Sequence, residues 1–230
     1  LITAILTFSY FVFRDNGVFT VIDDFNNQQL TFASTVWTAL RTGDPGEWVW
    51  NLDLGSSLVT GFSFYNFGSP FFLVSLLFPR GSFPYLAGFL YIAKYVVASL
   101  TAYIKKELFQ DRKKWHNNWR FIICFFRISD DQSSTFHFHD VVAFFPLLLW
   151  EIENNDNKKK YPAFIASVAI NCLVNYFFFI QETVFIVLYF IVRYWNTPKK
   201  QFLQKMLRGL LRGVLGVGMA AVFSYLTFFM

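Results

Sequence analysis

Charged residues are scarce in this chain, and the signatures of several enzyme classes are missing. Asp, Glu, Lys and Arg make up 15% of the 230 residues, whereas hydrophobic residues make up 55%. No P-loop, G-x-G-x-x-G, H-E-x-x-H or G-x-S-x-G motif occurs, so ATPase, Rossmann and hydrolase functions have no support. The two cysteines, Cys124 and Cys172, lie in or beside apolar runs, which indicates core residues rather than a disulfide or metal pair.

The composition indicates a membrane protein. A soluble domain with this hydrophobic fraction would not stay in solution, whereas a polytopic membrane protein would. The 32 phenylalanines suit lipid-facing helices, and the seven tryptophans suit membrane–water interfaces. The net charge of +5 comes from basic residues between apolar runs, which favours positive-inside topology over nucleic-acid binding.

The apolar runs predict an all-α fold, a polytopic transmembrane helical bundle with one domain over residues 1–230. A full crossing needs about 20 residues. The chain starts and ends inside apolar runs, so we expect a fragment of a longer protein. The expected crossings are about 1–13, 83–104, 119–136, 137–150, 161–177, 180–195 and 213–230, with a long loop over 14–81. The crossing at 119–136 should insert poorly, because charged residues flank its short apolar core.

The distribution of charge predicts the orientation in the membrane. Segment 105–127 has seven basic and two acidic residues, and segment 193–212 has six basic residues and no acid. Loop 14–81 has three basic and six acidic residues. By the positive-inside rule the basic segments are cytoplasmic and the loop faces outward, which for a bacterial chain is the cell exterior.

Two adjacent acids, Asp23 and Asp24, follow the first apolar run by about ten residues. A carboxylate beside a membrane exit can act as a general base that takes a proton from an acceptor hydroxyl. The same residues, followed by Asn-Asn-Gln-Gln, also suit a helix N-cap or a solvated turn. The two readings are compatible, because a capping helix could orient the neighbouring acid.

A tract rich in glycine and aromatic residues occupies positions 54–70 of the long loop. Its aromatic faces could stack on sugar rings, and its Asn and Ser side chains could bond hydroxyls. The alternative is a re-entrant segment at the membrane interface. Composition alone leaves both open.

Lys94 lies near the middle of the run 83–104. A cation at this depth is either functional or half of a structural pair, with a lipid phosphate, with Glu182 or with an acid outside this chain. Glu182 itself is expected in an exposed turn. The stretch His137–Asp140 resembles a metal site, but only two of its side chains would converge, and zinc sites need three or four protein ligands. We expect no metal there, and substrate hydrogen bonding or interfacial anchoring instead.

Several blocks together resemble the N-terminal part of the bacterial YfhO family. They are Asp24–Gln29, Leu52–Gly55 with Ser69-Pro70, the Lys94 helix with Tyr103, Phe138–Asp140, and Asn175–Phe178. Members of this family are polytopic membrane proteins of the GT-C glycosyltransferase type. The resemblance implies inverting sugar transfer on the outer membrane face, without metal or other cofactor. The donor would be a polyprenyl-phosphate sugar, and the acceptor a cell-envelope polymer such as lipoteichoic acid.

The resemblance also implies roles for particular residues and a cellular location. GT-C enzymes place a catalytic Asp in the first outer loop, which falls on Asp23 or Asp24. The implied partners are membrane lipid, the sugar donor and the acceptor polymer, and the implied location is the bacterial plasma membrane as a multi-pass protein. The candidate substrate contacts are Lys94, His139, Asp140 and Gln28, of which Lys94 and His139 would contact the donor's lipid phosphate.

The chain departs from the family between Glu107 and Ser134. Relatives are several times longer and have an ordinary hydrophobic helix there, whereas this stretch is charged and rich in tryptophan. A local, later restored shift of the reading frame would explain this, and would leave the fragment inactive. The rival function is a multi-pass permease in which Lys94 and Glu182 line a solute path.

Overall fold

The computed structural model describes residues 5–6, 9–10, 13–20, 25–42, 48–50, 54–107, 137–153 and 161–229. These residues are mostly helical, which confirms the predicted all-α class. The short elements are the π-helical turn η1 (Phe25–Gln29), α2 (Leu30–Thr42), strands β1 (Trp48–Val49) and β2 (Ser56–Ser57), α3 (Leu58–Phe62), the π-helical turn η2 (Ser63–Phe67) and α4 (Pro70–Ser75). The long helices are α5 (Phe83–Glu107), α7 (Phe138–Glu153), α8 (Tyr161–Val174), α9 (Tyr176–Arg193) and α10 (Lys199–Phe229).

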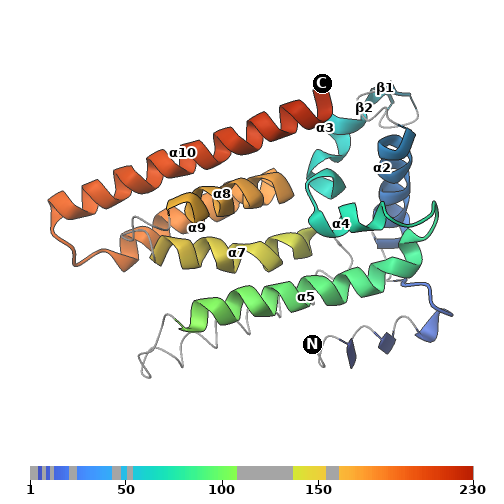
Figure 1. Cartoon of the computed structure of the whole chain (residues 1–230), viewed down its shortest axis with the longest axis horizontal. Coiled ribbons are helices and arrows are strands. Elements are labelled where there is room, and N and C mark those ends of the chain that lie inside the picture. The colour runs from blue at the N-terminus through green and yellow to red at the C-terminus, as the bar shows by residue number, and fades with distance from the viewer. Residues whose placement is uncertain are drawn as a thin grey trace.

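The long helices lie side by side, and the short elements gather at one end of them (Figure 1). We call this the loop end, and the opposite end, where α10 starts at Lys199, the basic end. Helices α5, α7 and α9 run in the same direction, as shown by the contacts Lys94–Asp140, Thr101–Ala143, Phe138–Phe178 and Phe145–Phe185. Helix α5 ends at the basic end, and α7 starts towards the loop end (Figure 1). The crossing predicted between them, 119–136, and the stretch 108–134 with its suspected frame shift lie outside the described residues.

Two helices of the described part are long and apolar enough to cross a membrane. They are Phe83–Ala102, within α5, and Tyr176–Arg193, which is α9. A third helix, Pro162–Val174, is apolar but shorter. The remaining crossings, and with them the multi-pass topology, stay predictions.

The break between α8 and α9 lies at Asn175. This residue has an extended backbone, and its side-chain oxygen accepts a hydrogen bond from the Phe178 amide at 3.1 Å, so it caps α9. The cap places Glu182 inside α9, with only 7% of its surface exposed. The expectation of an exposed turn at Glu182 is therefore wrong, because the new helix starts at Asn175 and not after Gln181.

Segments of the long loop fill the loop end of the bundle. The tract 54–70, for which sugar stacking and re-entrant packing were both open, forms β2, α3 and η2, and its Phe62 and Tyr65 rings pack on Phe32 of α2. Burial of aromatic rings contributes much of the packing energy of such a core. The hydrophobic core at the loop end includes the buried side chains of Phe19, Phe25, Phe62, Phe67, Phe72, Ala87 and Tyr91.

Helix α10 packs on α8 through a glycine. A Cβ atom at Gly216 would lie 2.7 Å from the side chain of Val168 and 2.8 Å from the carbonyl oxygen of Ile165. Small residues at such positions let membrane helices approach closely. The expected crossing 213–230 thus falls within one continuous helix that begins 14 residues earlier, at Lys199.

The tightest contact of the loop end is made by Gly68, at the end of η2. A Cβ atom there would lie 1.7 Å from the carbonyl oxygen of Leu173, which is backbone and cannot rotate away. This contact joins the loop to the end of α8, just before the Asn175 cap.

We expect Gly68→Ala to lower the stability of the purified protein by about 1–3 kcal/mol, because the methyl group must displace backbone. Thermal unfolding in detergent measures this. Gly218→Ala is the matched control, since nothing lies within 4 Å of a Cβ at Gly218. Alanine is the better helix former, so this control should be neutral or slightly stabilising. Equal melting temperatures for the two variants would contradict the close approach.

Candidate functional site

The six candidate residues from the sequence fall into three groups. Asp23 and Asp24 lie outside the described residues, so their placement stays a prediction. Gln28 lies in η1 and is half-buried. Three others, Lys94, His139 and Asp140, are brought together in one buried cluster beneath the loop end.

A buried ion pair forms the centre of this cluster. The Lys94 Nζ atom lies 2.9 Å from Asp140 Oδ1, and both side chains are at most 1% exposed. Asp140 sits in the first turn of α7, where the helix dipole favours an anion. The Ser69 side chain lies close to the Asp140 carboxylate, and the Phe71 ring lies 5.6 Å from Lys94 Nζ. Each charge therefore has a partner, as buried charges require.

His137 connects the loop to the start of α7. Its Nδ1 atom lies 3.1 Å from Oε1 of Gln29, an acceptor, so Nδ1 donates this hydrogen bond. The Tyr65 ring lies 4.4 Å from the His137 ring. Gln29 belongs to η1 and Tyr65 to η2, so His137 meets both π-helical turns. Such turns are rare and are frequent at functional sites.

His139 lies in an aromatic pocket formed by α5. Its ring centroid is 5.0 Å from that of Tyr91 and 5.6 Å from that of Tyr95. Tyr91 also packs on Phe19 and Phe25, at 5.0 and 6.0 Å. The chain therefore touches Tyr91 both before and after residues 21–24.

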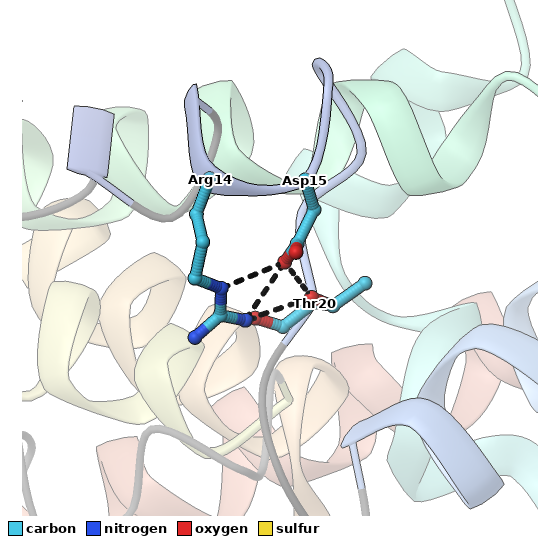
Figure 2. A network of polar contacts seen from close by, with 3 residues as sticks. All are labelled: Arg14, Asp15 and Thr20. Atoms are coloured by element: carbon cyan, nitrogen blue, oxygen red, sulfur yellow. Dashed lines mark hydrogen bonds and ion pairs between the residues drawn. The ribbon is translucent and has the colours of Figure 1, made fainter.

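The segment leading to these four residues is held by an exposed polar network. Arg14 Nη2 lies 2.7 Å from Asp15 Oδ2 and donates to the carbonyl and hydroxyl oxygens of Thr20, and the Thr20 hydroxyl donates to Asp15 (Figure 2). Asn16 and Gly17, with φ of +55° and +92°, make the intervening turn. The hydrogen bond from Arg14 lowers the pKa of Asp15, so this carboxylate stays ionised at neutral pH.

Glu182 takes no part in the ion pair. Glu182 was one of three possible partners named for Lys94 from the sequence. The structure pairs Lys94 with Asp140 instead. Within the described part of the chain, neither carboxylate oxygen of Glu182 has a hydrogen-bond partner. No group of three or more His, Cys, Asp or Glu side chains that could hold a metal occurs among the described residues.

Sequence reasoning overlooked four residues of the cluster. Ser69 and His137 belong to motifs that were noted, but neither was named as a site residue. Gln29 is the neighbour of the Gln28 that was named, and only its buried contact with His137 distinguishes the two. Tyr91 lies one helical turn before Lys94 and therefore on the same face of the helix, so it could have been predicted from the sequence.

Comparison with known proteins gives one match. A family model described as "Bacterial membrane protein YfhO" matches residues 1–229. No curated protein and no solved structure matches the chain.

Proposed function

The chain belongs to the YfhO family of bacterial membrane proteins, and from this membership we propose that it is part of a membrane glycosyltransferase. In this proposal it transfers a sugar from a polyprenyl-phosphate donor to a cell-envelope polymer such as lipoteichoic acid. It works at the outer face of the plasma membrane, in a multi-pass protein, and Asp23 or Asp24 is its general base.

The position of Phe25 is the observation that supports this proposal best. Its side chain is fully buried, and it packs on Phe19 and Tyr91. Asp24 is the residue immediately before it, and consecutive Cα atoms are about 3.8 Å apart. The residue that follows the proposed base is therefore anchored on Tyr91, whose ring also contacts His139 of the buried cluster.

The proposed chemistry is a single displacement. The carboxylate of Asp23 or Asp24 takes the proton of an acceptor hydroxyl, and the hydroxyl oxygen attacks the anomeric carbon of the donor sugar. The bond from that carbon to the phosphate oxygen breaks with inversion, and polyprenyl phosphate leaves with the bonding electrons. Positive charge near the leaving phosphate would stabilise the transition state. Lys94 and His139 remain our candidates for that charge, with Asp140 holding Lys94 in place, although both side chains are buried in this structure and Lys94 is paired with Asp140.

The polymer of a strain that lacks the full-length protein tests the function. We expect its lipoteichoic acid, or another envelope polymer, to lose a sugar substituent while the polymer backbone is still made. Complete hydrolysis and sugar analysis of the purified polymer measure this, and a plasmid copy of the gene should restore the sugar.

The rival permease function predicts a different result. A solute carrier or a non-enzymatic assembly factor would leave the sugar content of every envelope polymer unchanged. That outcome would overturn the glycosyltransferase proposal. The pairing of Lys94 with Asp140 removes one argument for the permease, which was a path lined by Lys94 and Glu182.

A further inference from the structure

The first half of α10 carries exposed cations at the basic end. Lys199, Lys200 and Arg208 are exposed, and α10 contains no acidic residue. A fourth cation, Lys205, makes a cation–π contact within the protein, since its Nζ atom lies 4.5 Å from the centre of the Tyr194 ring. The three exposed cations form no ion pair among the described residues, so their positive charge is uncompensated within the described part of the chain.

An exposed apolar row begins beside these cations. Leu203, Leu207, Leu210 and Val214 follow at helical spacing on one face of α10, and each is more than half exposed. Lys199 lies four residues before Leu203, so it continues the same row. The contact face of α10 is a different one, since Phe202 packs on Phe190 and Gly216 packs on α8.

We propose that this face of α10 binds an anionic phospholipid of the inner leaflet. The phosphate headgroup sits at Lys199 and Lys200, and an acyl chain runs along the row from Leu203 to Val214. Clusters of basic residues at the cytoplasmic end of a membrane helix are suited to acidic headgroups. A neutral lipid would use the row but not the cations, and a soluble anion would use the cations but not the row. The site lies at the opposite end of the bundle from the proposed sugar transfer and does not depend on it (Figure 1).

Native mass spectrometry and thermal unfolding of the full chain in neutral detergent test the proposal. We expect phosphatidylglycerol to be retained and to raise the melting temperature, whereas phosphatidylcholine with the same acyl chains and inorganic phosphate do neither. The double variant Lys199→Gln/Lys200→Gln should bind phosphatidylglycerol about 30-fold more weakly, from the loss of two cations near the headgroup.

The matched control removes two exposed cations from the loop end. Arg41→Gln/Arg80→Gln changes the net charge equally and should leave phosphatidylglycerol binding unchanged. Leu203→Gln/Leu207→Gln should weaken binding while keeping both lysines. Equal retention of the two lipids, or full binding by the lysine variant, would overturn the site. Loss of a concentration-dependent dimer in the leucine variant, with lipid binding unchanged, would assign the row to a second copy of the chain instead.

Discussion

Asp24→Asn in the full-length protein is expected to reduce polymer glycosylation by about 10²- to 10⁴-fold, the range that a general base contributes. Asparagine keeps the size of the side chain and its capacity to cap a helix, but it cannot accept the proton of the acceptor hydroxyl. Transfer of labelled sugar from a polyprenyl-phosphate donor to the polymer, in membranes with matched protein amounts, measures the effect. Asp23→Asn is tested beside it, because only one of two adjacent acids is expected to face the acceptor.

Asp15→Asn is the matched control for these variants. Asp15 lies in the same loop, but its carboxylate binds Arg14 and Thr20 in an exposed turn (Figure 2). The Asp15→Asn variant should transfer sugar at close to the rate of the unchanged protein. Full activity in both the Asp23→Asn and the Asp24→Asn variants would refute the assignment of the base. A defect in the Asp15 variant as large as in the others would show that loop charge, rather than a particular base, is required.

Lys94→Met and Asp140→Leu, made singly, are each expected to lower the stability by about 3–5 kcal/mol, because each leaves an uncompensated charge in the core. Both side chains are at most 1% exposed, so water cannot replace the lost partner. Thermal unfolding of the purified variants in detergent, together with their abundance in the membrane, measures the loss.

The double variant Lys94→Met/Asp140→Leu separates structure from function. It replaces the pair with apolar side chains of similar volume, an exchange that is often neutral or stabilising for buried pairs. We expect its stability to recover close to that of the unchanged protein while sugar transfer stays at the background level. Recovery of transfer along with stability would reduce Lys94 and Asp140 to packing partners and remove them from the site.

The apolar pattern predicted much of the helical framework. The expected crossing 83–104 falls on α5, and the long apolar run after Tyr161 divides into α8 and α9. The division was misplaced by a few residues, because hydropathy does not show that Asn175 caps a helix. Glu182 was expected in an exposed turn because it is charged, but the sequence does not distinguish an acid in a turn from an acid buried inside a helix.

The site was predictable in its residue types and not in its pairings. A lysine in the middle of an apolar helix indicates a buried partner, but nothing in the sequence connects Lys94 to an acid on α7 that lies well over forty residues later. Gln29 and Ser69 were overlooked for the same reason, since their contacts with His137 and Asp140 join segments far apart in the chain. The family match confirms the resemblance to the YfhO family, whereas the role of Asp23 and Asp24 stays a proposal.

The Lys94–Asp140 pair also has a consequence for the order of membrane insertion. During synthesis α5 leaves the ribosome before α7, and chains grow at about 5–20 residues per second, so Lys94 waits several seconds for its counter-ion. Over that interval an unpaired lysine in the middle of α5 opposes insertion by about 2.5–3.5 kcal/mol. We therefore expect α5 to insert stably only once α7 has been made, so that α5 and the predicted crossing 137–150 would enter the membrane as a coupled unit.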